Sequence, residues 1–332
     1  MSITVRKFTA GPDDNGRRVD RIVRRLYPDT PLSALYRLFR TGSIRLGNMK
    51  AKPEDRVSAG DILAIRSSDA SGNPDSAAGS LDRKDAPGGD RSSLFAAILI
   101  VQTSDLAIVN KPRGLLTHGA GGLDELASAY FSARASGSLA FRPAPLHRLD
   151  RNTSGALAIS ASIAGARAFS LALREGRVDK IYLAVLDGRF DGNEEWVDTL
   201  SRTGSDGKTE AGREGARPAT TLVEPLAYAA GRTLARIRLM TGFTHQIRAQ
   251  AAIHGHPLSG DAKYGGSAFA GGYLLHCAEL GIPEDIGIEN PGIVVAELSP
   301  RAEITIKSIF LDIPASFLPR RSPNTLAAGP EP

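Results

Sequence analysis

Residues 145–159 read PLHRLDRNTSGALAI, and the organisation of the chain can be worked out from this stretch. Asp150 stands just before Asn-Thr-Ser-Gly, a composition typical of a turn, and the apolar residues that follow have the pattern of a buried strand. A carboxylate on a loop that enters a strand can be held rigidly and aimed into a cleft. The alternative is that Asp150 only caps the turn, and the segment by itself favours this alternative.

Apolar runs of the same kind recur on both sides of this segment and alternate with helical patterns. This alternation predicts a mixed α/β or α+β domain over residues 95–314. The tail, residues 315–332, has the composition of a frayed end. The strand-like runs are 97–101, 107–109, 156–160, 182–186 and 234–239, and the helical stretches are 163–174 and 245–254.

A second polar stretch further along the chain could supply a partner for Asp150. Residues 241–248 read TGFTHQIR, in which Thr244 can cap a helix that carries His245 and Arg248 on one side. Arg248 could pair bidentately with a carboxylate elsewhere and hold that carboxylate ionised and oriented.

Two other chemistries are weaker interpretations of these segments. A metal site would need His245, His254 and His256 as ligands, but no Cys or Glu stands at a ligand spacing. A serine hydrolase would use Ser154 and His147, yet the sequence offers no Gly-x-Ser-x-Gly elbow. We therefore predict neither a metal site nor a hydrolase.

The first 66 residues form a different, basic module. They hold 14 Lys and Arg against 7 Asp and Glu; because the whole chain carries +5, the remaining 266 residues carry a net −2. Helical and strand-like spacing predicts a small folded domain at 16–66, followed at 67–94 by a flexible linker of Ser, Gly, Asp, Ala and Pro. Residues placed to hold a phosphate backbone are Arg37, Arg40, Arg45, Lys50 and Lys52.

Composition limits the remaining possibilities. The single cysteine, Cys277, excludes an internal disulfide framework and a cysteine-rich zinc site. The first residues lack a long apolar stretch, and nowhere do as many as about 18 apolar residues run together. We expect a soluble, cytoplasmic monomer with no membrane segment.

Residues 16–66 resemble the small RNA-binding domain typified by ribosomal protein S-four. The resemblance is carried by PLSALYRLFRTGSIRL at 31–46 and KPEDRVSAGDIL at 52–63. It implies that the basic module binds RNA, and it implies nothing about catalysis.

The longer part of the chain resembles the RluA/RluC/RluD family of pseudouridine synthases. With the basic module in front, the resemblance is closest to the C-type members, which act on large-subunit (23S) ribosomal RNA or a pre-ribosomal particle. It implies a catalytic domain at 95–314 with a central, largely antiparallel sheet, which isomerises uridine to pseudouridine without a cofactor. Four landmarks stand in the family's order: IVNKPRGLLTH at 108–118, HRLDRNTSG at 147–155, KIYLAV at 180–185 and TGFTHQIR at 241–248.

The resemblance also implies roles for single residues. Asp150 matches the catalytic carboxylate, and Arg248 matches the arginine that pairs with it. Tyr182 matches a tyrosine that packs on the uracil ring and is a candidate for removing the C5 proton. Ile247 matches an apolar position lining the uracil pocket, and Arg148 matches an arginine that contacts the RNA backbone as the uridine flips out.

Some positions depart from the family or receive no role. Phe243 stands where Arg is usual, and Ala249-Gln250 stand where Val-His is usual, so each could remove an RNA or packing contact. Asn110 and Lys111 are interpreted as sheet-edge residues near the cleft without a chemical role. One rival function is a catalytically silent RNA-binding or ribosome-assembly factor, and another keeps the chemistry but acts on transfer RNA. Asp150 could act as a nucleophile or as a base.

Overall fold

The computed structural model describes residues 3–27, 30–68, 91–132, 139, 141–202, 208–212 and 216–311. The chain divides into two compact units, Met1–Ser93 with Ser128–Pro143, and Leu94–Ala127 with Ala144–Pro332. The divisions pass through helices α3 (Arg91–Ile98) and α4 (Leu123–Ser132).

The predicted domain boundaries differ from these units at several points. The N-terminal unit takes in strand β1 (Ile3–Thr9) and residues 128–143 in addition to the predicted domain 16–66. Strand β4 (Ile62–Ser68) and helix α3 occupy the two ends of the predicted linker 67–94. Residues 69–90 of that linker, and the predicted tail 315–332, lie outside the described residues.

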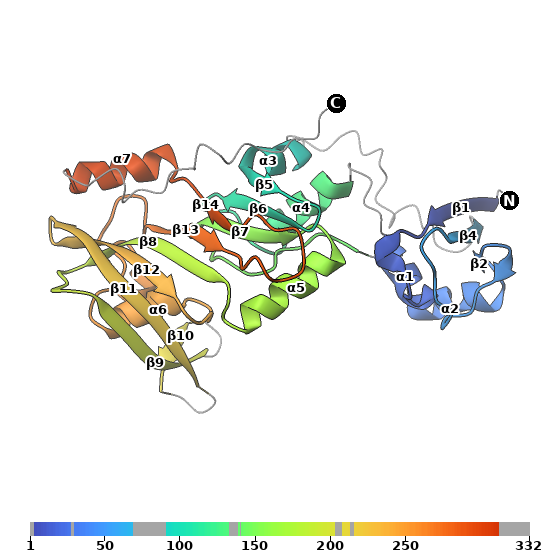
Figure 1. Cartoon of the computed structure of the whole chain (residues 1–332), viewed down its shortest axis with the longest axis horizontal. Helices are drawn as coiled ribbons and strands as arrows, with labels where there is room; N and C mark the ends of the chain where they lie inside the picture. The colour runs from blue at the N-terminus through green and yellow to red at the C-terminus, as the bar shows by residue number, and fades with distance from the viewer. Residues whose placement is uncertain are drawn as a thin grey trace. The chain divides into compact units, whose positions relative to one another are not determined.

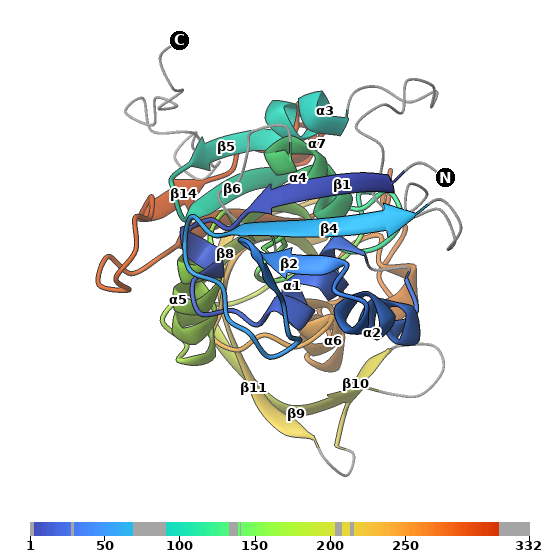
Figure 2. The same cartoon turned by 90° about the vertical axis from the view of Figure 1, so that its right-hand side faces the viewer.

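The N-terminal unit packs two helices against one face of an antiparallel sheet, as Figure 2 shows. The described strands follow the order β1-β4-β2-β3, so the first and last strands of the unit lie side by side. Apolar residues at helical spacing, such as Ile22, Leu35 and Phe39, meet Ile44 and Leu63 of the sheet in one core. The other elements are η1 (Pro12–Asp14), α1 (Val19–Leu26), α2 (Leu32–Arg40), β2 (Ile44–Leu46) and β3 (Met49–Lys50).

The second unit is built on a long mixed sheet (Figure 1). Among the described residues its order is β10-β9-β11-β12-β8-β13-β7-β6-β5, with β14 added beside β13. The pair β13–β7 is parallel and the other pairs are antiparallel. The strands are β5 (Leu99–Gln102), β6 (Leu106–Lys111), β7 (Ser154–Ser160), β8 (Asp179–Asp187), β9 (Glu194–Arg202), β10 (Thr209–Ala211), β11 (Arg217–Ala229), β12 (Arg232–Leu239), β13 (Leu275–Gly281) and β14 (Ile293–Val295); the helices are α5 (Ile163–Arg174), α6 (Gln246–Ile253), η3 (Ala262–Tyr264) and α7 (Pro300–Ile309).

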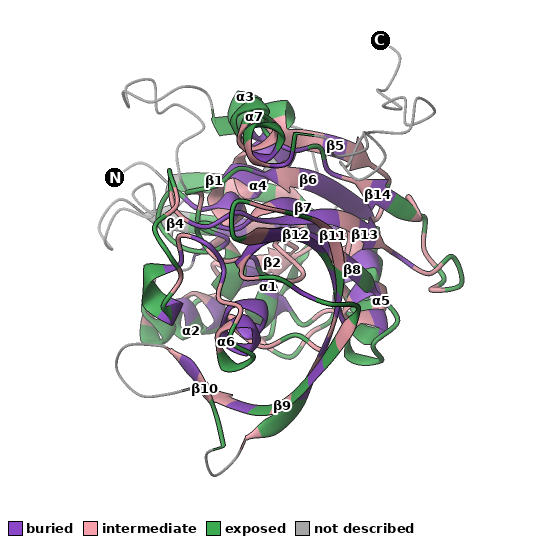
Figure 3. Ribbon diagram, turned by 90° about the vertical axis from the view of Figure 1, so that its left-hand side faces the viewer, coloured by how far each residue is buried: buried purple, intermediate pink, exposed green. Residues whose placement is uncertain are grey.

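Strand β8 in the middle of this sheet is buried on both faces, and Figure 3 shows the central strands largely purple. Because side chains alternate along a strand, Leu183 and Val185 point to one face, where they pack with Ile306 of α7. Lys180 and Tyr182 point to the opposite face and line a cavity. One face of β8 therefore packs in the hydrophobic core, and the other face lines the cavity.

The fold class is the predicted mixed α+β class, with a largely antiparallel central sheet. The predicted strand at 97–101 is wrong at its start, because residues 97 and 98 end helix α3 and β5 begins at Leu99. A short apolar run is compatible with either state, and its neighbours in space decide between them. Within the described part of the chain, none of the helices has the length and apolar character needed to cross a membrane.

Candidate active site

The loop that carries Asp150 is clamped by hydrogen bonds on both sides of that residue. Before it, the Thr117 hydroxyl donates to the carbonyl of Leu149 at 2.8 Å. After it, the carbonyl of Arg151 accepts from the Gly114 N–H at 2.7 Å, and the Arg151 guanidinium donates back to the Gly114 carbonyl at 3.1 Å. Residues 108–118, the first of the four family motifs, therefore hold the Asp150 loop in place through these hydrogen bonds.

Lys111 connects these residues to the Asp150 loop, and the interpretation made of it from the sequence needs correction. It is fully buried, and its ammonium donates to the carbonyls of Leu115, Pro112 and Arg151 at 2.8, 3.0 and 3.3 Å. Burial lowers the pKa of Lys111 to about 8, and the charge of Asp150 acts in the opposite direction. Lys111 is a buried residue of the interior strand β6 that positions the Asp150 loop, so the sheet-edge interpretation is wrong.

We expect Lys111→Met to lower the free energy of unfolding by about 2–3 kcal/mol, because it leaves buried carbonyls without a donor. Activity should fall with it, since the Asp150 loop loses its anchor. Urea denaturation measures the first effect. The control is Lys307→Met, which removes an exposed lysine paired with Glu303 and should change stability by less than about 0.5 kcal/mol. Equal stabilities for the two variants would contradict the prediction.

The carboxylate of Asp150 points away from the turn that follows it. The turn closes through the backbone, because the Thr153 N–H donates to the Asp150 carbonyl at 3.0 Å. The side-chain oxygen Oδ2 instead accepts from Nη1 of Arg248 at 3.2 Å and lies 3.7 Å from Nε2 of His245. The turn-capping alternative is therefore wrong, and Arg248 of α6 and His245, the residue just before that helix, both face Asp150.

Arg248 is held by a second carboxylate that the sequence prediction missed. Its Nε and Nη2 donate to Asp261 at 2.6 and 2.8 Å, so the bidentate partner is Asp261 and Asp150 receives a single bond. The guanidinium carbon also lies 5.0 and 4.7 Å from the ring centroids of Tyr264 and Tyr273. Burial opposes the charge of Arg248, but the hydrogen bonds to Asp261 together with the electrostatic effects of Tyr273, Asp261 and Asp150 outweigh it and raise the pKa of Arg248 above its ordinary value.

His245 adopts a conformation that brings its ring beside Asp150. It is the N-cap of α6, with φ 57° and ψ 21° in the left-handed region, so the prediction that Thr244 caps this helix is wrong. Nδ1 of His245 lies 3.0 Å from the Tyr264 hydroxyl, which also accepts the Thr209 N–H at 2.9 Å. This network is satisfied when the hydroxyl donates to Nδ1 and Nε2 carries the imidazole proton toward Asp150. Burial lowers the pKa of His245.

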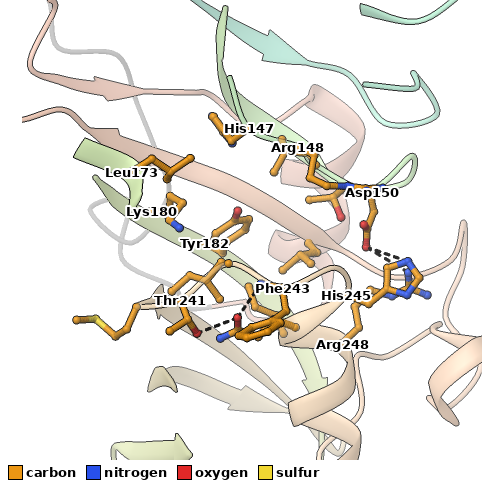
Figure 4. A pocket seen from close by; sticks show the side chains of 18 of the residues that line it. His147, Arg148, Asp150, Leu173, Lys180, Tyr182, Thr241, Phe243, His245 and Arg248 are labelled. Atoms are coloured by element: carbon orange, nitrogen blue, oxygen red, sulfur yellow. Dashed lines mark hydrogen bonds and ion pairs between the residues drawn. The ribbon is translucent and has the colours of Figure 1, made fainter. Parts of the chain in front are cut away.

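These groups border a cavity of about 330 Å³ (Figure 4). Tyr182 is 5% exposed, and burial raises its pKa well above the ordinary value. Ile247 contributes a buried apolar wall, and Arg148 stands exposed at the rim. The five residues predicted for this site, Asp150, Arg148, Tyr182, Ile247 and Arg248, all line this one cavity.

The comparisons with known proteins agree with this geometry. Residues 105–252 match the RNA pseudouridylate synthase family. The ribosomal large subunit pseudouridine synthase C of Escherichia coli K12 is 30% identical over 277 residues, which cover 81% of this chain and 82% of that protein. The chain belongs to the RluA/RluC/RluD family of RNA pseudouridine synthases. Its Salmonella typhimurium relative of the same name is 29% identical over 275 residues, covering 80% and 82% of the two chains.

A solved structure supports the fold of this pseudouridine synthase. The human RNA pseudouridylate synthase domain containing 4 superimposes with a TM-score of 0.54 at 20% identity, covering 65% of this chain and 94% of that one. The family catalyses an isomerisation, in which no group leaves the RNA and no oxidation state changes.

The two family departures have different structural consequences in this synthase. Gln250 is fully buried and accepts from Thr221 at 2.6 Å, while its amide donates to Asp198 at 2.8 Å. It ties α6 to the sheet and offers no surface for RNA. Phe243 does line the cavity, and the Arg217 guanidinium lies 5.5 Å from its ring centroid.

The histidines of the rejected metal interpretation lie in different surroundings. His254 stacks on Trp196 with ring centroids 5.1 Å apart, and His256 packs against Phe190 at 4.1 Å. Among the described residues, no group of three or more His, Cys, Asp and Glu could hold a metal ion. Ser154 bonds to Nδ1 of His276 at 2.9 Å, so His147 is not its partner.

The basic residues of the N-terminal unit lie at the end of α2 and in the β2–β3 hairpin and the loop after it. Arg37, Arg40, Lys50 and Lys52 are exposed, and Arg45 is half-buried. The Lys50 ammonium donates to the Arg40 carbonyl at 2.7 Å, which links the hairpin to the helix end.

Proposed function

We propose that this enzyme isomerises specific uridines of large-subunit ribosomal RNA to pseudouridine, with Asp150 as the essential carboxylate. The observation that carries the proposal is the placement of that carboxylate. It is 15% exposed, faces a cavity sized for a single nucleotide, and accepts only one hydrogen bond from an arginine that a second carboxylate already holds. The Asp150 carboxylate is thus not fully engaged by its partner.

The chemistry needs one such group. When the N1–C1′ bond of uridine breaks, its electron pair goes to the uracil and C1′ becomes electron-poor, as in glycoside cleavage. An ionised carboxylate can form a bond to C1′, or it can remove the C2′ proton and leave a glycal. The uracil then turns and C5 joins C1′, as the bond from C1′ to the carboxylate breaks or the proton returns to C2′; the proton on C5 is lost and N1 gains one. Both routes place the carboxylate beside the sugar.

The other cavity residues fit supporting roles. Tyr182 and Ile247 would pack on the uracil ring, and Arg148 at the rim would contact the RNA backbone of the flipped nucleotide. Because burial raises the pKa of Tyr182, its phenol is neutral in the empty cavity. That protonation state favours packing on the ring over proton removal by the free enzyme.

Large-subunit ribosomal RNA is the substrate that two observations favour. The C-type relatives named above act on the ribosomal large subunit by name, and the basic N-terminal unit carries the charge expected of an RNA-binding module. Phe243 and Gln250 are the departures that supported a catalytically silent assembly factor. In the part of the chain that the structure describes, neither side chain interacts with Asp150.

The test is release of tritium from large-subunit RNA labelled at uridine C5, with transfer RNA assayed in parallel. We expect release from ribosomal RNA. Faster release from transfer RNA than from ribosomal RNA would identify transfer RNA as the substrate. Tight RNA binding without tritium release at stoichiometric enzyme would support the catalytically silent RNA-binding factor. Carbodiimide mapping of ribosomal RNA from cells with and without the gene would then locate the modified uridines.

Neutralising the basic residues of the N-terminal unit should weaken binding of ribosomal RNA and reduce its salt dependence. Each lost phosphate contact lowers the slope of log K against log salt by about 0.7–0.9, so the loss of all five would lower it by about 3.5–4.5. The variant combines Arg37→Gln, Arg40→Gln, Arg45→Gln, Lys50→Gln and Lys52→Gln. The matched control changes the three arginines to lysine, which conserves charge and should conserve the slope. An unchanged slope in the glutamine variant would contradict the prediction.

A further inference from the structure

Lys180 is a buried cation inside the candidate active site to which no role has been given so far. It is 7% exposed and lines the cavity. It lies two residues before Tyr182 on β8, so the two side chains share a face of the sheet, and their Cα atoms lie about 7 Å apart along the strand. A Cβ added to Gly242 on the cavity wall would lie 3.6 Å from the Lys180 Nζ atom, which places the ammonium beside the 241–243 loop.

Within the described ranges, no carboxylate forms an ion pair with this ammonium. Among the interactions of the described residues, none is a hydrogen bond or ion pair of Lys180 Nζ. Asp179 is the neighbour in sequence, but it is exposed and accepts two bonds from Arg238, at 3.1 and 2.6 Å. Because successive residues of a strand point to opposite faces, Asp179 lies away from the cavity.

The titratable groups that face Lys180 are neutral. Burial lowers the pKa of His147 to about 3, and the charge of Lys180 adds to this effect. Burial raises the pKa of Cys277, which pairs with Tyr182 across the strands, to about 12. Burial also raises the pKa of Tyr182. None of these groups supplies a negative charge at neutral pH.

A buried ammonium without an ion-pair partner destabilises the fold, because the cost of desolvating it is only partly offset by more distant charges such as that of Asp179. Burial lowers the pKa of Lys180 for this reason. A buried charge without a structural partner, at the wall of a cleft, points to a ligand that brings negative charge with it. The proposed reaction creates such a charge on the uracil.

We propose that Lys180 is a further catalytic residue, which donates a hydrogen bond to a carbonyl oxygen of the uracil and stabilises the negative charge on the detached base. This inference rests on the proposed function and deepens it. When N1–C1′ breaks, both electrons of the bond go to the uracil, and the charge spreads over N1 and the carbonyl oxygens. Lys180 keeps its proton throughout. The charge is neutralised when C5 bonds to C1′; the proton then lost from C5 to solvent is matched by one gained at N1.

The arrangement separates the two charges of the bond-breaking step. Figure 4 shows Asp150 and Lys180 on opposite sides of Tyr182. The Asp150 carboxylate would stabilise the electron-poor C1′ of the sugar, and the Lys180 ammonium would stabilise the negative charge on the uracil. Tyr182, which lies between them, would pack on the uracil ring. Because the uracil is uncharged before the bond breaks, Lys180 would stabilise the transition state more than the bound substrate.

The test compares Lys180→Met with the parent enzyme by steady-state tritium release. We expect kcat to fall by about 10²–10³-fold, as for loss of a single anion-stabilising donor, with KM for RNA little changed. The melting temperature should be equal to or above that of the parent, because an unpaired buried charge is removed. Lys180→Arg, which keeps the charge, should be at least about tenfold more active than Lys180→Met.

The matched control is Arg238→Met, which removes one positive charge from the neighbouring strand outside the cavity and should leave kcat unchanged. An active parent with an equally active Lys180→Met would overturn this inference and leave the proposed function standing. A clear drop in the melting temperature of Lys180→Met, or equal losses in Lys180→Met and Lys180→Arg, would also overturn it. If the parent releases no tritium from any RNA, both proposals fail.

Discussion

Replacing Asp150 with asparagine should reduce tritium release from uridine-labelled RNA by at least about 10³-fold, the scale expected when a positioned nucleophile or base is lost. The amide has nearly the shape of the carboxylate and can still accept the bond from Arg248. It cannot, however, bond to C1′ as an anion or take a proton from C2′. The loss should appear in kcat, whereas RNA affinity should stay close to that of the parent.

Stability should change little in Asp150→Asn, because Arg248 retains its two bonds to Asp261. This separates a chemical defect from a folding defect. Asp285→Asn provides a control, since that carboxylate is 77% exposed, pairs with Arg177 and does not line the cavity. If Asp150→Asn released tritium within about tenfold of the parent rate, Asp150 would not be the catalytic group.

The second large effect is expected for Asp261→Asn. Asp261 is 1% exposed and neutralises Arg248, which is 8% exposed as a side chain. Removing one partner of a buried ion pair leaves an uncompensated charge, which costs about 3–5 kcal/mol of stability. Arg248 should then turn toward Asp150, and a displacement of about 1 Å at such a group can cost on the order of 10² in rate.

Urea denaturation and tritium release together test this prediction. The matched control is Asp179→Asn, which breaks the 2.6 Å pair with Arg238, a pair whose side chains are 52% and 47% exposed. Exposed pairs contribute less than about 1 kcal/mol, so this variant should be close to the parent. Adding Arg248→Met to Asp261→Asn should restore part of the lost stability without restoring activity. If the double variant is no more stable than Asp261→Asn, the uncompensated charge is not the cause.

The departures from the family pattern show where sequence comparison alone misleads. A glutamine in place of the usual residue at position 250 suggested a lost RNA or packing contact, without deciding between them. In the structure this amide binds two strands, β9 and β11: besides the bonds to Thr221 and Asp198, it donates to the carbonyls of Trp196 and Ala219, each at 3.1 Å. Position 250 therefore contributes to the packing of the domain, and its identity carries no information about the substrate.

The sequence by itself determined those features that depend on neighbours in the chain. Helical spacing placed α1, α2 and α5, the Asn-Thr-Ser-Gly run placed the turn before β7, and alternation set Tyr182 on one face of β8. Four ordered motifs indicated the family and the residues of its cavity. The tertiary structure alone decided which charges meet: Asp261 pairs with Arg248, Lys111 anchors the Asp150 loop, and Lys180 lines the cavity without an ion pair to any carboxylate of the described residues. The physical reason is that hydrogen bonds and charge interactions act over a few ångströms in space, and the fold sets those distances independently of separation along the chain.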